Sequence, residues 1–161
     1  LLNAAYYDVP QKRQRLFYIG VRKDLNVEPA FPTPNSTTIS YGSILEKNTK
    51  FTFLTKKEVD KVIKHAKQQK LKGNSFGFHY NSPLKPFRTI TKTKSSNALI
   101  KVNDLYRYPT VTELKRICSF PDDFKLIGTF EQQWARLGNA VMPNQMKAIA
   151  NTIRQEILKW N

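Results

Sequence analysis

The sequence predicts an α+β fold in which a small, irregular, β-rich region is flanked by a strand and a C-terminal helix that belong to a larger α/β domain. Residues 16–21 form a short, nearly continuous apolar run, which is typical of a strand buried on both faces. Residues 74–102 mix aromatic, polar and small residues with prolines, which favours short strands and loops. Apolar residues recur at helical spacing after residue 55 and after residue 143, so helices are predicted there.

The composition allows a folded core and favours a negatively charged partner. A chain of 161 residues fits one ordinary domain, or one small domain plus pieces of another. Its 40% hydrophobic and 12% aromatic residues argue against a wholly disordered chain. The net charge of +15 favours a polyanion, because each neutralised phosphate releases condensed counterions. The other interpretation is a basic, soluble surface with no partner.

Cysteine use and hydropathy point to an intracellular protein. Cys118 is the single cysteine, so no internal disulfide can form and nothing indicates an oxidising compartment. No apolar run approaches the roughly 20 residues that span a bilayer, and the first ten residues do not resemble a signal peptide. The chain starts with Leu1 and with residues typical of the middle of a domain, which predicts a fragment of a longer protein.

The first predicted strand region, residues 11–22, begins with Gln11, Arg13 and Arg15. Residues two apart on a strand share a face, so these three side chains are expected to point the same way. Three long hydrogen-bonding side chains on one side would make a clamp for phosphates or base edges. For an isolated pattern of this kind, a solvated basic strand end is the better interpretation.

Helix predictions rest on caps and periodicity. Thr55 with Glu58 forms a capping box, and Gly73 is a plausible stop signal after it. The lysines on the opposite face of this helix are interpreted first as a solvated face and second as a site of non-specific attraction to phosphates. A second capping box, Thr110 with Glu113, opens a helix that Pro121 ends. The last helix is predicted to begin at about Pro143, a favoured first helical position.

Four blocks, in order along the chain, resemble the 5-methylcytosine DNA methyltransferase family. The family's QxRxR block stands here as QKRQR at residues 11–15, and Thr89-Ile90 is the best candidate for its Thr-Leu/Ile/Val pair in the target-recognition region. Residues 107–122, RYPTVTELKRICSFPD, match its RxLTxxExxRxxxFPD block, although Pro109 replaces the usual Leu. Residues 138–143, GNAVMP, match its last block.

The resemblance implies a DNA-binding surface and a contact to S-adenosylmethionine. Arg13 and Arg15 would hold phosphates near the target, and Arg15 would also hold the flipped cytosine. Thr89 would contact the phosphate beside that nucleotide, within a DNA-binding set completed by Gln11, Thr91 and Lys92. Asn139, Ala140 and Val141 would contact the cofactor, in a Gly-Asn-small stretch expected at a helix start. Standing alone, this stretch is better interpreted as a plain turn leading into a helix.

The residues that perform the family's chemistry do not occur in this chain. Methylation of cytosine at carbon 5 needs a thiolate nucleophile, an acid for the ring nitrogen and a held methyl donor. The family supplies them from Pro-Cys, Glu-Asn-Val and Gly-rich segments, none of which occurs in these 161 residues. Cys118 is expected to be buried packing. His65 and His79 have no metal-like spacing, so no metal site is expected.

The sequence thus predicts the DNA-recognition half of a bacterial cytosine-5 methyltransferase of a restriction–modification system. Residues 1–26 and 138–161 would belong to the methyltransferase domain, 27–106 to the target-recognition domain, and 107–137 to a helix and turn of the small domain. Its partners would be double-stranded DNA and the N-terminal catalytic half, with no membrane, in the cytoplasm at the nucleoid. The alternatives are a non-catalytic sequence-specific DNA-binding module and a basic RNA-binding or ribosome-associated domain.

Overall fold

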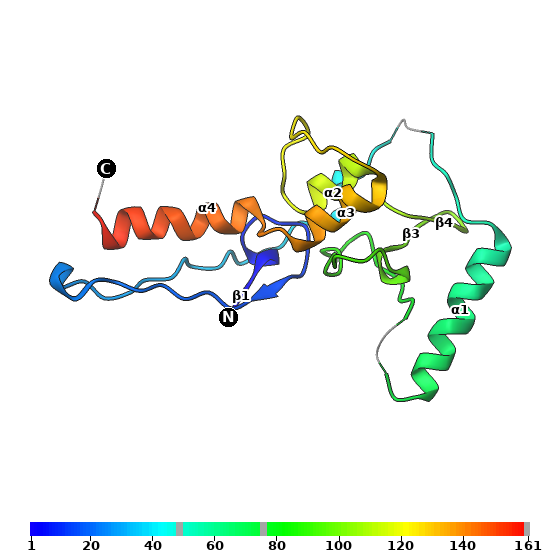
Figure 1. The fold of residues 1–161 in the computed structure, drawn as a ribbon, viewed down its shortest axis with the longest axis horizontal. Coiled ribbons are helices and arrows are strands. Elements are labelled where there is room, and N and C mark those ends of the chain that lie inside the picture. Colours follow the sequence, from blue (N-terminus) through cyan, green and yellow to red (C-terminus); the bar gives the residue numbers. More distant parts are fainter. Residues whose placement is uncertain (48–49, 75–76, 160–161) are drawn as a thin grey trace.

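The computed structural model describes residues 1–47, 50–74 and 77–159. The chain is elongated, with a central body around α2 and α3, an arm formed by α4 and extended chain, and α1 projecting at the opposite end (Figure 1). None of the helices in these three ranges is both long and apolar enough to cross a membrane. The α-helices and strands are β1 Leu2–Asn3, β2 Gln14–Arg15, α1 Lys56–Leu71, β3 Ile100–Val102, β4 Leu105–Arg107, α2 Val111–Ile117, α3 Phe130–Asn139 and α4 Pro143–Thr152. Short 3₁₀ turns cover Ala4–Tyr6, Lys23–Leu25, Tyr41–Ile44 and Ser96–Ala98, and a π-helical turn, Ile153–Ile157, extends α4.

Both predicted capping boxes are present. The Thr55 hydroxyl accepts from the Glu58 amide, and the Glu58 carboxylate accepts from the Thr55 amide, so α1 begins at the expected residue. Gly73 ends the helix with a φ of +74°, a conformation that favours glycine. Thr110 and Glu113 cap α2 in the same way. This second helix ends at Ile117, four residues before the expected Pro121.

The helix α3 was not predicted, and its position changes the interpretation of the last block. A third capping box, Thr129 with Gln132, starts it, and Gly138 and Asn139 are its last two residues. These residues therefore end a helix, and the expectation of a helix start at this point was wrong. The next helix, α4, begins at Pro143 as predicted, because proline at the first position has no amide hydrogen to satisfy.

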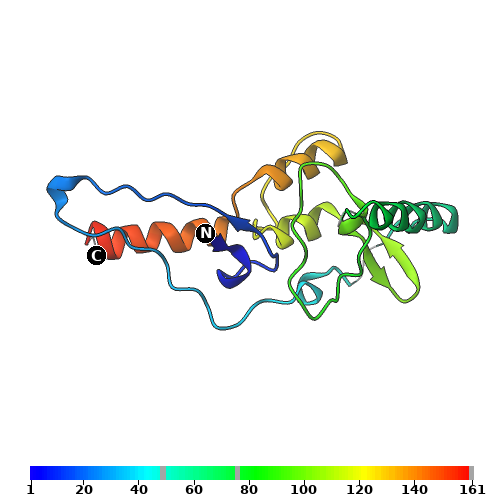
Figure 2. The same ribbon diagram turned by 90° about the horizontal axis from the view of Figure 1, so that it is seen from below.

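Strand content is smaller than the β-rich expectation. The described residues form two antiparallel pairs, β1 with β2 and β3 with β4, each of two or three residues per strand. Residues 16–21 are extended but carry no ladder, and Leu16 and Tyr18 are 59% and 88% exposed. The expected strand buried on both faces is therefore wrong for this chain, since no neighbouring strand among the described residues covers it. This segment runs beside α4 in both views (Figures 1 and 2).

The core lies where α2 and α3 meet the N-terminal residues and the loop before β3. Tyr41 and Phe87 pack edge to face with ring centroids 4.8 Å apart, and Trp134 packs against Tyr108 and Phe130. Such aromatic pairs each add roughly 0.5–1.5 kcal/mol beyond the burial of their area. The buried cluster consists of Ala4, Val9, Tyr41, Phe87, Ile90, Ala98, Ile100, Leu114, Ile117, Cys118, Trp134, Leu137 and Met142.

Candidate functional site

Residues from all four sequence blocks meet around the side chain of Gln11. Gln11 is completely buried, and its Oε1 accepts from the amide of Ile90 at 2.9 Å. Its Nε2 lies 3.3 Å from the carbonyl oxygen of Ile117, 3.4 Å from Cys118 Sγ and 3.7 Å from Met142 Sδ. One amide side chain therefore connects the start of the chain with the loop before β3, the end of α2 and the start of α4.

Arg13 is the second interior connection. It is 3% exposed, and its guanidinium donates from Nη1 to the carbonyl of Ile90 at 2.8 Å and from Nη2 to the carbonyl of Gly138 at 2.9 Å. Among the described residues no carboxylate pairs with it, and its Nε has no hydrogen-bond partner. Burial, and then the positive charge of Arg15, lower the pKa of Arg13. The structure places this arginine inside the chain rather than on a ligand-facing surface.

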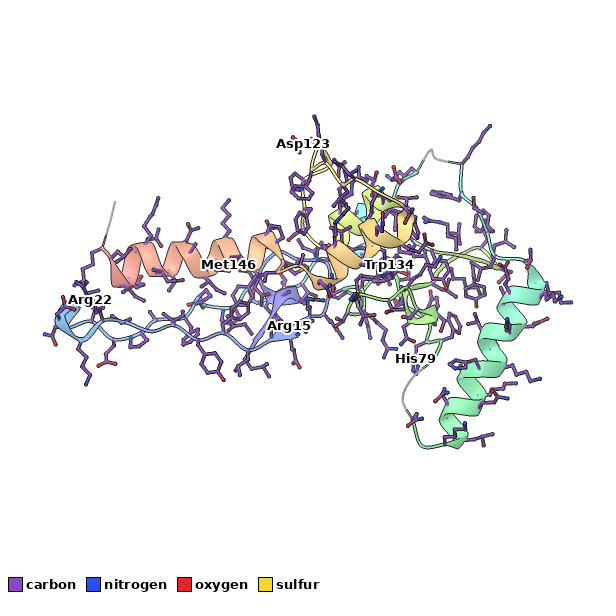
Figure 3. All side chains as sticks on the ribbon, viewed as in Figure 1. Arg15, Arg22, His79, Asp123, Trp134 and Met146 are labelled. Carbon is purple, nitrogen blue, oxygen red and sulfur yellow. The ribbon has the colours of Figure 1, made fainter. Side chains whose placement is uncertain are left out.

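The expectation that Gln11, Arg13 and Arg15 share an exposed face was wrong. The main chain at Gln11 pairs in parallel with Phe87, whereas Arg15 lies in β2 opposite Leu2. These two pairings turn the first two side chains inward and leave Arg15 exposed. Its Nη1 donates to the Gln14 carbonyl at 2.7 Å. Figure 3 shows Arg15 at the edge of the body, on the side opposite Asp123.

The loop of residues 89–92 is fixed against this interior. The Thr89 hydroxyl donates to the Lys12 carbonyl at 2.6 Å, and the indole Nε1 of Trp134 donates to the Thr91 carbonyl at 3.0 Å. Gly138 packs so closely that a Cβ there would lie 2.3 Å from the Thr91 carbonyl oxygen. Thr91 and Lys92 remain exposed at the surface. Of the predicted DNA-binding residues, the structure therefore brings Gln11, Arg13 and Thr89 together and leaves the other three on the surface.

Asn139, Ala140 and Val141 follow directly on Gly138. Asn139 and Val141 are exposed, whereas Ala140 is half-buried and extended at the C-cap of α3. The Asn139 side chain makes no hydrogen bond within the described residues, so its amide is available to a ligand. At the end of α3 the chain therefore presents an exposed amide side chain beside an exposed apolar one.

The third block, residues 107–122, forms a buried ion pair as well as a helix cap. Arg107 donates to both carboxylate oxygens of Glu113, at 2.6 and 2.7 Å, and both side chains are buried. Glu113 also accepts from the amides of Thr110 and Glu46. Nearer the surface, Arg116 forms a second ion pair with Asp122. The interior pair could not be predicted from the sequence, since no local pattern places Arg107 opposite Glu113.

Cys118 is completely buried, which confirms its expected packing role. Burial raises the pKa of its thiol to about 12, so the thiolate needed for nucleophilic attack is scarce at neutral pH. Within residues 1–47, 50–74 and 77–159, no cluster of three or more His, Cys, Asp or Glu side chains could hold a metal ion.

Trp134 and Gly138 are site residues that were not predicted from the sequence. The signal was present: Thr129-Phe-Glu-Gln132 is a capping box, and Trp134 and Leu137 follow it at helical spacing. A helix predicted from this pattern would have placed Gly138 on the same buried side as Trp134.

Comparisons with known proteins identify one family. The family model described as C-5 cytosine-specific DNA methylase matches residues 1–155. The type II methyltransferase M.AplI of Arthrospira platensis is 31% identical over 98% of this chain and 47% of its own length. The type II methyltransferase M.DsaV of Dactylococcopsis salina is 30% identical over 93% of this chain and 45% of its own.

A solved structure shares the fold. The crystal structure of S. pombe Dnmt2 methyltransferase matches with a TM-score of 0.61 at 15% identity, covering 99% of this chain and 56% of that one. The chain spans about half the length of the curated relatives it matches. Because the family model covers nearly the whole chain, this protein belongs to the C-5 cytosine-specific DNA methylase family.

Proposed function

We propose that this chain is the DNA-recognition part of a bacterial DNA cytosine-5 methyltransferase in a restriction–modification system. It acts in the cytoplasm, at the nucleoid, with a catalytic portion that lies in a longer chain or a separate polypeptide. The observation that carries the proposal is the convergence of four family blocks on Gln11 and Arg13. Residues 1–26 and 138–161 belong in this proposal to the methyltransferase domain, 27–106 to target recognition and 107–137 to the small domain.

The DNA side of the proposal rests on the exposed members of the predicted set. Arg15, Thr91 and Lys92 are exposed, and they lie at the ends of segments that the buried side chains hold in place. Extruding a cytosine from double-stranded DNA costs a few kcal/mol, and charge-assisted contacts to the surrounding phosphates offset part of that cost. In this proposal Arg15 contacts the flipped base and phosphates directly, and Arg13 acts from the interior.

The cofactor side rests on Asn139 to Val141. S-adenosylmethionine, when bound, supplies the methyl group that is transferred to carbon 5 of the cytosine. Asn139 can donate or accept a hydrogen bond, and Val141 can cover an apolar part of the ligand. In this proposal these residues form one wall, and the catalytic portion forms the others.

Without its catalytic portion the chain is inactive in this proposal. The reaction needs a thiolate, and the single cysteine is buried, with a pKa of about 12. The chain therefore positions the DNA and closes the cofactor site, while the nucleophile is supplied by the partner portion.

The test is methyl transfer after mixing. Radiolabelled S-adenosylmethionine and duplex DNA carrying the target cytosine should give no labelled DNA with this chain alone and labelled DNA with the cognate catalytic portion. Arg15→Ala should lower the rate, whereas Arg22→Ala, at the far end of the arm in Figure 3, should not. A folded complex that transfers no methyl group would overturn the proposal. If the chain binds its duplex equally well with and without the catalytic portion and S-adenosylhomocysteine, the non-catalytic DNA-binding module is correct.

A further inference from the structure

One guanidinium holds together the two surfaces that the proposed function assigns to different ligands. Arg13 Nη1 binds the carbonyl of Ile90, inside the 89–92 loop, and Nη2 binds the carbonyl of Gly138, next to Asn139. We propose that Arg13 is a positioning residue that couples DNA binding to cofactor binding, by fixing the 89–92 loop relative to the end of α3. This inference rests on the proposed function, since it needs both ligands.

Direct contact between the two segments supports the coupling. Gly138 has no side chain, and its Cα approaches the Thr91–Lys92 peptide so closely that an added Cβ would lie 2.3 Å from the Thr91 oxygen and 2.8 Å from the Lys92 nitrogen. Trp134, one turn earlier in α3, donates to that same Thr91 oxygen at 3.0 Å. The close contact at Gly138 prevents the end of α3 from moving toward the loop, and the Trp134 hydrogen bond opposes movement away from it. A shift of the helix end therefore displaces the loop backbone.

Gln11 holds the loop from the other direction. Its Oε1 accepts from the Ile90 amide, so both backbone polar groups of Ile90 are bound by side chains of the first block. The Thr89 hydroxyl adds a bond to the Lys12 carbonyl. Because interior side chains bind both the amide and the carbonyl of Ile90, its neighbours Thr91 and Lys92 hold a defined position at the surface.

The chemistry of arginine is what this position requires. A planar guanidinium presents donors in a fixed fork, so it can satisfy two carbonyls on different segments at once. A lysine ammonium keeps the charge but is a compact point donor on a flexible stem. Arg13 has no carboxylate partner among the described residues, so its two strong contacts are these two carbonyls. Its role is therefore to hold two segments in a fixed relative position. Arg13→Lys tests this role, because it keeps the positive charge and removes the two-pronged donor.

The consequence is a reciprocal change in affinity. A cofactor that favours one arrangement of the end of α3 also favours the matching arrangement of the 89–92 loop, and so raises the affinity for DNA. By linkage, DNA must raise the affinity for the cofactor by the same factor. We expect S-adenosylhomocysteine to tighten DNA binding by at least about fivefold in the complex of this chain with its catalytic portion. We expect DNA to tighten S-adenosylhomocysteine binding by the same factor.

The experiment measures the Kd for duplex DNA with and without saturating S-adenosylhomocysteine in that complex. For Arg13→Lys the ratio of the two Kd values should fall to near one. Trp134→Phe, which removes the indole donor to Thr91 and keeps a smaller aromatic ring at that position, should lower the ratio in the same direction and serves if Arg13→Lys does not fold. Arg107→Lys is the matched control, because it alters another buried arginine that contacts neither segment and should leave the ratio unchanged.

The outcomes separate this inference from the proposed function. If the wild-type complex binds neither ligand, the proposed function fails. If it binds both ligands without coupling, or if the ratio persists in both Arg13→Lys and Trp134→Phe, the inference is overturned. A ratio lost equally in Arg107→Lys would show a general loosening of the fold and would also overturn it.

Discussion

At the scale of single residues, Glu113 does more than complete the capping box of α2, because it also binds two other segments of the chain. Its carboxylate accepts hydrogen bonds from Nη1 and Nη2 of Arg107 at the end of β4, from the amide of Thr110 at the start of α2 and from the amide of Glu46 in a distant loop. The guanidinium of Arg107 also lies 3.8 Å from the ring centroid of Phe51. One buried negative charge therefore fixes three segments, and its removal leaves the positive charge of Arg107 without compensation.

Glu113→Gln should destabilise the fold strongly. The substitution keeps the shape of the side chain but removes its charge, and an uncompensated buried ion costs about 3–5 kcal/mol. Urea unfolding followed by circular dichroism measures the change. The matched control is Asp122→Asn, which breaks the exposed pair with Arg116 and should cost less than about 1 kcal/mol. Equal losses in both variants would contradict a special role for the interior pair.

The first block shows why residue-level predictions from sequence succeed only in part. The sequence identified Gln11, Arg13 and Arg15 as a group, and the structure brings two of them to the point where the blocks meet. Their orientation could not be predicted, because a strand face is set by its pairing partners. Here the pairing changes from Phe87 to Leu2 within four residues.

At the scale of elements, local signals predicted helices well and strands poorly. A capping box needs only residues three apart, so the starts of α1 and α2 could be predicted from the sequence. Strands need a partner from elsewhere in the chain, and residues 77–99, where short strands were expected, mostly form loops. The loops are still fixed in place, as Asn81 shows by donating from Nδ2 to the carbonyls of Asn97 and Leu99.

The helix α1 is lightly packed and strongly basic. None of its residues is buried, and its apolar residues Val59, Val62 and Ala66 are only half-buried. Residues 56–72 carry seven lysines against two carboxylates, which places a net charge of +5, a third of the total, on a tenth of the chain. Within the part of the chain that the structure describes, none of these lysines is in an ion pair.

A triple substitution on α1 should reduce the salt dependence of DNA binding. Each phosphate contact contributes about 0.9 to the slope of log K against log salt concentration, so Lys57, Lys61 and Lys64 changed to Gln should lower it by up to about 3. Fluorescence anisotropy at several salt concentrations gives the slope. In the control variant, Lys23, Lys125 and Lys147 are changed to Gln, and the slope should equal that of the wild type. Equal slopes for the two triple variants would contradict the prediction, because they would show that α1 adds positive charge to the protein but makes no phosphate contacts.

At the scale of the whole molecule, the central body and the arm expose their apolar side chains to different degrees. The central body buries its aromatic residues, whereas the arm exposes large apolar side chains, including Leu16, Tyr18 and Met146. Large apolar side chains gathered on a projecting arm favour contact with another protein surface over exposure to water. The sequence predicts that the strand region and the last helix belong to a larger α/β domain, and the exposure of apolar side chains in both is consistent with that prediction.

Hydrogen exchange should show the arm becoming ordered when the catalytic portion binds. Within the described residues, no backbone amide of residues 16–21 donates to another backbone group, so these amides should exchange rapidly in the isolated chain. If the segment joins a sheet of the catalytic portion, each alternate amide gains an acceptor and its exchange should slow by at least about tenfold. Amides of α1, at the opposite end in Figure 1, should be unchanged and provide the internal control. Unaltered exchange at residues 16–21 in a complex that transfers methyl groups would mean that this segment is not the surface on which the two portions meet, and that α4 carries the contact of the arm instead.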